Sequence, residues 1–148
     1  MTPPTIPSGS KILLDSMTVI YFLEQHEQYG ELARQVFQRI EAGDLRGLMT
    51  SLVFAELLVP LYRSEKAGTV RQFVDVLSHY RHLNILEVST EISMEAARLR
   101  ARYGLRTPDA IHGATALLGQ ADGILTNDKN FNHLANEGLS IWLFDQFI

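Results

Sequence analysis

Two short apolar runs that each stop at a carboxylate constrain the fold of this chain more than any other feature. Ile12–Leu14 lies directly before Asp15. Asp122–Thr126 is followed by Asn127 and then by Asp128. Such apolar runs are typical of strands buried on both faces of a parallel sheet. Ligands bind beyond the carboxyl ends of these strands, so both acids are predicted to point into a site.

Helical patterns alternate with further strand candidates along the whole chain. This alternation predicts an α/β fold with a mainly parallel central sheet between layers of helices. Three more strands are predicted at Arg46–Thr50, Leu83–Val88 and Leu139–Phe144. Helices are predicted over 17–26, from near 28 to 43, over 51–66, 69–81 and 89–104, and from Thr107 onward, where Thr107 is the expected N-cap and Pro108 the first helical residue.

Length and composition fit one ordinary globular domain. The chain has 148 residues, of which 46% are hydrophobic and 20% charged. Residues 1–10 contain three prolines and are predicted to be a flexible leader before a domain over 11–148. No run approaches the roughly 20 apolar residues of a membrane-spanning helix. The absence of cysteine excludes thiolate metal sites and is compatible with the cytoplasm. A net charge of −4 argues against broad capture of nucleic acid but allows a local basic patch.

Glu56 interrupts an apolar stripe within the predicted helix that follows Ser51. Leu52, Ala55 and Val59 share its face at helical spacing. We expect this face to point into the core, where a glutamate is costly unless it is paired or bound to a metal. Pro60 is expected to end or kink the helix.

Asp109 lies in the first turn of a predicted helix and shares a face with His112, Gly113 and Ala116. The two small residues would allow that face to approach another backbone closely, which would partly enclose the aspartate. For His112 a packed or solvated role is favoured over contact with a substrate. An acid at this position is, by itself, also consistent with simple stabilisation of the helix dipole.

The four acids, Asp15, Glu56, Asp109 and Asp128, can all reach the same edge of a parallel sheet. Their mutual repulsion would raise their pKa values unless cations neutralised them, and oxygen-only ligands favour Mg²⁺ or Mn²⁺ over zinc. Such a cluster is typical of metal-assisted phosphodiester cleavage. The alternative for Asp15 or Ser16 is that it merely caps the next helix.

Four motifs occur in a characteristic order: LLDS, SLVFAELL, TPDAIHGATAL and ILTNDKNF. In this order and spacing the sequence strongly resembles the PIN domain family, and in particular the small VapC-type toxins, from about Lys11 to the end. The resemblance implies a single-domain, three-layer α/β sandwich. It also implies that Asp15, Glu56, Asp109 and Asp128 bind the metal, that Thr126 supports the site, and that Ser16 and Asn127 occupy the small and variable positions beside the first and last acids.

The resemblance implies an endoribonuclease that depends on Mg²⁺ or Mn²⁺, acting as the toxin of a toxin–antitoxin pair. Phe54 and Leu58 lie on a different helix face from Glu56, so this helix is apolar on more than one side and should be covered by another element. The family suggests a homodimer partner and an antitoxin whose amphipathic segment lies between helices and brings a basic side chain near the acids.

Two other functions remain open at the level of sequence. One is a non-catalytic module of the same fold that binds RNA or supports assembly, although the presence of all four acids favours activity. The other is an aspartyl phosphotransferase of the haloacid dehalogenase kind, which needs a second acid two positions after Asp15. Met17 stands there, where many PIN domains carry a small polar residue. Arg98 and Arg102, four residues apart on one helix, are predicted to form a solvated face, with phosphate contact as the alternative.

Overall fold

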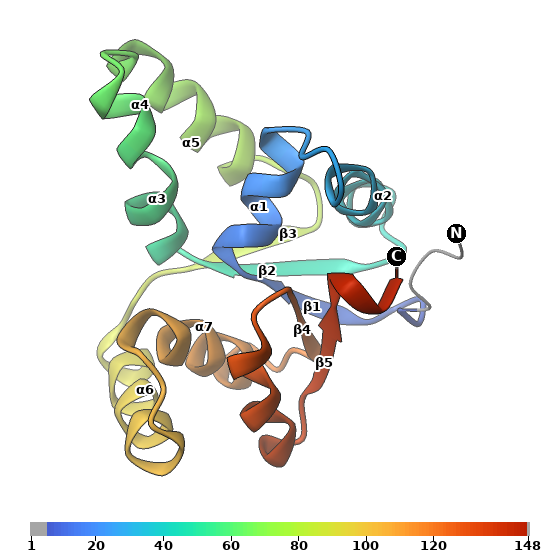
Figure 1. Cartoon of the computed structure of the whole chain (residues 1–148), viewed down its shortest axis with the longest axis vertical. Coiled ribbons are helices and arrows are strands. Elements are labelled where there is room, and N and C mark those ends of the chain that lie inside the picture. Colours follow the sequence, from blue (N-terminus) through green and yellow to red (C-terminus); the bar gives the residue numbers. More distant parts are fainter. Residues whose placement is uncertain (1–5, 148) are drawn as a thin grey trace.

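A five-stranded, wholly parallel sheet forms the centre of the molecule (Figure 1). The computed structural model describes residues 6–147. Along the sheet the strands run in the order β3-β2-β1-β4-β5. This confirms the predicted parallel sheet and the approximate position of every predicted strand. The strands are β1 (Lys11–Leu14), β2 (Arg46–Thr50), β3 (Leu83–Leu86), β4 (Gly123–Thr126) and β5 (Ser140–Leu143).

Helices cover both faces of the sheet, so the fold is a three-layer α/β sandwich as predicted (Figure 1). One face is covered by α1 (Ser16–Leu23), α2 (Gly30–Glu41) and an arm of short helices. The arm consists of α3 (Leu52–Leu57), α4 (Val59–Arg63), the 3₁₀ turn η1 (Ala67–Thr69) and α5 (Val70–Ser78). The other face is covered by α6 (Thr90–Tyr103), α7 (Thr107–Leu118) and the 3₁₀ segment η2 (Lys129–Glu137), and η3 (Phe144–Phe147) follows β5.

The alternation of side chains along β1 divides the core into two clusters. Ile12 and Leu14 pack on the α1–α2 side with Phe37, whereas Leu13 packs on the α6–α7 side with Leu99. All five side chains are fully buried. Burying each one stabilises the fold by roughly 1.5–3 kcal/mol. Packing on both faces therefore fixes β1, and this fixes the backbone position of Asp15, which follows it.

The arm differs from the rest of the molecule because it buries little. Val53 is the only buried residue of α3, Leu77 is the only one of α5, and α4 has none. The prediction that Glu56 lies on a core-facing stripe is wrong, since Ala55 and Val59 on the same stripe are exposed. The physical reason is that α3 has only six residues and faces the core through Val53, on another side of the helix.

Three further expectations are corrected at helix ends and in the leader. The cap of α7 is Arg106 rather than Thr107, and no side chain caps this helix. Ser51 precedes α3 as predicted, but its hydroxyl accepts a hydrogen bond from the Val88 backbone instead of capping the helix. Of the predicted leader, residues 1–5 lie outside the described residues. Ile6, by contrast, is part of the core, and its carbonyl accepts a 2.9 Å hydrogen bond from Arg39, so this end of the leader is packed. Within residues 6–147 no helix combines the length and apolar character needed to cross a membrane.

Candidate functional site

The candidate site lies where the strand order reverses. β1 and β4 are neighbours in the sheet, yet the chain leaves β1 toward β2 and leaves β4 toward β5 on the opposite side. Such a switch point opens a crevice at the carboxyl ends of the two strands. Asp15 directly follows β1, and Asp128 follows β4 after one intervening residue. This is the arrangement that the two apolar runs predicted.

Asp15 forms the floor of the site. Its side chain is almost enclosed, since the residue is only 4% exposed. One carboxylate oxygen lies 3.0 Å from both the backbone nitrogen and the hydroxyl of Thr18, and the other accepts a hydrogen bond from the Thr126 hydroxyl. Burial raises the pKa of Asp15 even though these hydrogen bonds and the charge of His112 oppose the rise. Asp15 also caps α1, which confirms the capping interpretation and is compatible with a position in the site.

Glu56 reaches the same edge from the arm and makes contact with two polar side chains. The Ser16 hydroxyl donates a 2.6 Å hydrogen bond to Oε1 of Glu56, and Nε2 of His112 lies 3.4 Å from both of these oxygens. The hydrogen bond to His112 is the main cause that holds the pKa of Glu56 below its usual value. His112 is buried, and its Nδ1 has no hydrogen-bond partner among the described residues. Three residues from α1, α3 and α7 thus form one polar cluster.

Asp109 lies in the first turn of α7 and is buried, as the sequence predicted. Its Oδ2 accepts a 3.3 Å hydrogen bond from Nε of Arg106, one turn earlier in the chain. The small residue Gly113 allows close packing on this helix, but its neighbours are side chains rather than another backbone. A methyl group there would lie 2.7 Å from Leu134 and 3.2 Å from Leu99.

Asp128 is more exposed than Asp15 and Asp109. It is half-buried, and its side chain accepts a 2.9 Å hydrogen bond from the backbone of Asn130 as the cap of η2. Its own backbone donates to the Thr126 hydroxyl, which also bonds Asp15, so Thr126 links the two strand ends. Asn127 points elsewhere, since its side-chain oxygen accepts a 3.3 Å hydrogen bond from the backbone of Asp145.

Metal-binding geometry is not formed in this arrangement. Within residues 6–147, no three His, Asp or Glu side chains lie close enough together to hold one ion. The chemistry of the donors nevertheless fits Mg²⁺ or Mn²⁺, because hard carboxylate oxygens are available from two buried aspartates, Asp15 and Asp109. Arg106 contacts only Oδ2 of Asp109, and its charge would compete with an ion for this carboxylate.

Besides the contacts of Glu56 with Ser16 and His112, two contacts within short stretches of the chain were not identified from the sequence. Thr18 supports Asp15 from three residues downstream, and Arg106 pairs with Asp109 from three residues upstream. The spacing i, i+3 was the available signal, because it places side chains on neighbouring positions of a helix or its cap. Met17 is exposed and apolar two positions after Asp15, which removes the second acid that a phosphotransferase requires.

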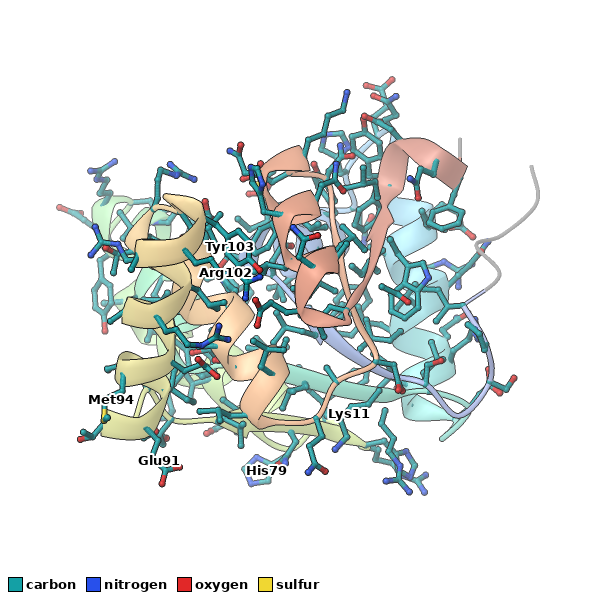
Figure 2. The ribbon with its side chains drawn as sticks, turned by 90° about the horizontal axis from the view of Figure 1, so that it is seen from below. Lys11, His79, Glu91, Met94, Arg102 and Tyr103 are labelled. Carbon is teal, nitrogen blue, oxygen red and sulfur yellow. The ribbon has the colours of Figure 1, made fainter. Side chains whose placement is uncertain are left out.

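A basic cluster lies beside the site, at the end of α6. Figure 2 shows Arg102 and Tyr103 together next to η2. Glu137 accepts hydrogen bonds from Tyr103, from Arg98 at 2.7 Å and from Arg102 at 3.2 Å. The predicted solvated face therefore holds for Arg102, which is mostly exposed, but both arginines are also anchored to η2.

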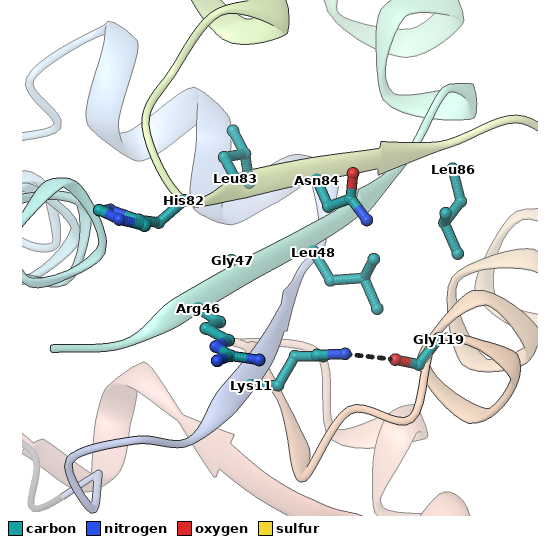
Figure 3. Close-up of a pocket in the computed structure, with 9 residues that line it drawn as sticks. All are labelled: Lys11, Arg46, Gly47, Leu48, His82, Leu83, Asn84, Leu86 and Gly119. Atoms are coloured by element: carbon teal, nitrogen blue, oxygen red, sulfur yellow. Dashed lines mark hydrogen bonds between the residues drawn. The ribbon is translucent and has the colours of Figure 1, made fainter. Parts of the chain in front are cut away.

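A separate hollow of about 430 Å³ lies at the opposite end of the strands, where β1, β2 and β3 begin (Figure 3). It is bordered by the first residues of three strands, Lys11, Arg46 and Leu83. The Lys11 ammonium donates a 3.1 Å hydrogen bond to the Gly119 carbonyl there. Asp15 and Asp128 follow the carboxyl ends of β1 and β4, and Glu56 contacts Ser16 beside Asp15, so this hollow at the amino ends of the strands is not part of the candidate site.

Comparison with known proteins decides the family. The family model described as PIN domain matches residues 12–137. The chain belongs to the PIN domain family. No curated protein sequence matches this PIN domain.

Solved structures similar to this PIN domain come from several bacteria. A chain of VapBC2 from Rickettsia felis, bound to a DNA fragment from its promoter, matches with a TM-score of 0.67 and 20% identity over 89% of this chain and 98% of that chain. VapBC-1 from nontypeable Haemophilus influenzae matches with a TM-score of 0.66 and 19% identity over 91% and 98%. A toxin–antitoxin complex from Klebsiella pneumoniae matches with a TM-score of 0.64 and 22% identity over 87% and 95%. At such identities these matches show a shared fold.

Proposed function

We propose that this PIN domain is an endoribonuclease that hydrolyses RNA phosphodiester bonds with the help of Mg²⁺ or Mn²⁺. The observation that carries the proposal is the position of Asp15. A carboxylate buried at the switch point of a parallel sheet, and fixed there through both oxygens, is costly to the fold. Its retention is explained by a function that needs a negative charge at that point.

The chain's own residues would hold the ion between Asp15, which is the floor of the site, and the other three acids, Glu56, Asp109 and Asp128, which form its rim. Asp15 and Asp109 are the buried ligands in this proposal, with Glu56 and Asp128 as the outer ones. When bound, the ion supplies activation of a water molecule for in-line attack and stabilisation of the leaving oxygen. Thr18 and Thr126 fix the orientation of Asp15. Ser16 and His112 favour the ionised form of Glu56, which suits a ligand better than a proton donor.

Cleavage of a mixed RNA pool tests the enzymatic proposal. We expect cleavage with Mg²⁺ or Mn²⁺ and none after addition of a chelator. The same ions at millimolar concentration should raise the melting temperature, because an ion that binds only the folded state stabilises that state. RNA binding without cleavage at any metal concentration would contradict the proposal.

That contrary result would support the second candidate, a non-catalytic module that binds RNA or supports assembly. One observation favours this alternative. Within residues 6–147, no three potential ligands are arranged closely enough to hold an ion. The metal-dependent melting temperature separates the two functions, since a module without a metal site would show no shift.

We further propose that this protein is the toxin of a toxin–antitoxin pair that acts in the cytoplasm. The similar structure from Klebsiella pneumoniae is described as a toxin–antitoxin complex, and one from Mycobacterium tuberculosis as a member of the VapBC family of toxin–antitoxin systems, which supports an antitoxin partner. A mainly apolar hollow of about 210 Å³ between α1 and the arm suits an amphipathic segment of that partner. Glu24 and Glu56 border this hollow and would attract a basic side chain. Its apolar lining consists of Ile20, Leu23, Leu57, Pro60, Leu61 and Phe73.

A homodimer is the second part of the partner proposal. The arm exposes Val59, Tyr62 and Val76, and Tyr62 is 59% exposed. Large apolar side chains grouped on an arm with little core of its own suit an interface. Light scattering at micromolar concentration should give the mass of a dimer, and a monomer would contradict this part alone.

Expression in bacteria tests the toxin assignment. We expect the intact protein to inhibit growth, Asp15→Ala to relieve the inhibition, and a cognate antitoxin to suppress it. Asp75→Ala, a change of an exposed aspartate on α5, is the matched control and should remain toxic. Harmless expression of the intact chain without an antitoxin would contradict the toxin assignment and leave the nuclease proposal in place.

A further inference from the structure

Arg106 occupies an unusual position at the mouth of the site. It is the last residue before α7, and its side chain does not cap the helix. Its side chain is 74% exposed, whereas the side chain of its partner Asp109 is 9% exposed. The guanidinium therefore lies in solvent but reaches down to a buried acid.

The contact between Arg106 and Asp109 is loose compared with the other contacts of this basic region. Within residues 6–147, the hydrogen bond of 3.3 Å to Asp109 is the only one that the Arg106 side chain makes. Arg98, by contrast, is bound to both Glu95 and Glu137. Because the guanidinium is mostly exposed and the bond is long, solvent screens this ion pair, so Arg106 can change partner.

The charge of Arg106 also acts on a second acid of the site. The pKa of Glu56 is lowered first by the hydrogen bond to His112 and further by Ser16, by the charge of His112 and by the charge of Arg106. Arg106 thus lies within electrostatic reach of one acid from α7 and one from α3. In the absence of a metal ion it partly offsets the negative charge of both.

A divalent cation bound by these acids would compete with Arg106 for Asp109 and repel its guanidinium. A released guanidinium offers a planar pair of N–H donors, which matches the oxygens of a phosphate group. The mouth of the site is the place where the backbone of a bound RNA strand must pass. Arg106 can therefore pair with Asp109 in the metal-free protein and with a phosphate of the substrate in the metal-bound protein.

We propose that Arg106 exchanges partners, pairing with Asp109 in the metal-free protein and with a phosphate of bound RNA when the metal is present. This inference rests on the proposed function of the same site. It assigns to Arg106 a role in binding the substrate and in setting the metal affinity, and none in folding.

Titration calorimetry with Mn²⁺ tests the first half of the exchange. Arg106→Ala removes the competing cation and should tighten Mn²⁺ binding about two- to five-fold, in line with the strength of an ion pair screened by solvent. Arg106→Lys keeps a positive charge and should stay near the wild-type affinity. Arg34→Ala is the control, because Arg34 is also exposed and forms an i,i+3 ion pair, with Glu31 on α2, and this change should leave the affinity unchanged.

Fluorescence anisotropy with a labelled single-stranded RNA tests the second half. With Ca²⁺ present, Arg106→Ala should weaken binding and reduce the slope of log K against log salt by about 0.7, the value for one phosphate contact on a single strand. In EDTA the variant should bind RNA with the wild-type slope. An unchanged Mn²⁺ affinity, or the same loss of slope with and without the ion, would overturn the exchange. Absence of Mn²⁺ binding by the wild-type protein would overturn the proposed metal site as well.

Discussion

The floor and the rim of the candidate site are built in different ways. On the floor, Asp15 is enclosed, and its oxygens are held by groups on α1 and at the end of β4 at about 3.0 Å or less. On the rim, Glu56 has a side chain that is 38% exposed and lies on a six-residue helix of the arm. Glu56 accepts one short hydrogen bond, from Ser16 at 2.6 Å, but its contact with His112 is long, at 3.4 Å, as is that of Asp109 with Arg106, at 3.3 Å. The difference indicates a floor that is preorganised and a rim that can rearrange around a ligand.

The largest expected effect is on catalysis, and it tests whether a rearranging rim still supplies an essential ligand. Asp109→Asn keeps the size of the side chain but removes its charge toward the ion. We expect cleavage to fall on the order of 100-fold or more while the circular dichroism spectrum stays unchanged. Asp75→Asn on α5 serves as the control and should cleave normally. Normal cleavage by a folded Asp109→Asn variant would exclude this residue as a ligand.

The next effect concerns the folding stability that is lost by burying the ionised carboxylate of Asp15. Burial raises the pKa of Asp15 above its ordinary value of 3.8, so the folded chain binds this proton more tightly than the unfolded chain. The resulting stability is fully present below pH 3.8 and is lost as pH rises through the raised pKa. Without metal, Asp15→Asn should therefore unfold at a higher urea concentration than the wild type at neutral pH.

Urea unfolding in EDTA across pH 4–8 measures that difference directly. Subtracting the two curves removes the contribution of acids with lowered pKa values, such as Glu137, whose effect on stability has the opposite sign. The advantage of Asp15→Asn should grow with pH. A variant that is less stable than the wild type at every pH would show that the hydrogen bonds of the carboxylate outweigh its burial.

A smaller effect separates a floor hydrogen bond from a rim hydrogen bond. Thr126→Val keeps the shape of the side chain but leaves Oδ2 of Asp15 and the backbone N–H of Asp128 without this partner, which should cost roughly 2 kcal/mol of unfolding free energy. Ser16→Ala removes the bond to Glu56, whose side chain can turn to water, and should cost about 0.5 kcal/mol. Equal losses in the two variants would contradict the contrast between floor and rim.

The sequence predicted the floor better than the rim for a physical reason. Strands that are buried on both faces show continuous apolar runs, so the ends of β1 and β4, and the acids after them, could be located without a structure. The orientation of Glu56 could not, because it depends on where a short helix ends and on which side meets the core. Its contact with His112 joins residues 56 positions apart, and no local pattern encodes such a pair.

The cap of α7 shows the same limit at short range. Thr107 and Pro108 fit the usual start of a helix, yet the capping position belongs to Arg106, whose side chain turns toward Asp109. The attraction between two opposite charges, three residues apart and at the edge of a crevice, placed this side chain. Capping preferences alone do not contain that information.

The hydrogen bond between Thr126 and Asp15 joins residues 111 positions apart. The site can therefore form only late in the synthesis of the chain. A chain that is still being synthesised presents β1 and β2 early, but β1 has no neighbour on its other side until β4 has emerged. Pairing of strands so distant in sequence also slows folding. A nascent chain that lacks β4 therefore carries Asp15 without the hydrogen bond from Thr126, and the site is complete only after the chain has been made through β4.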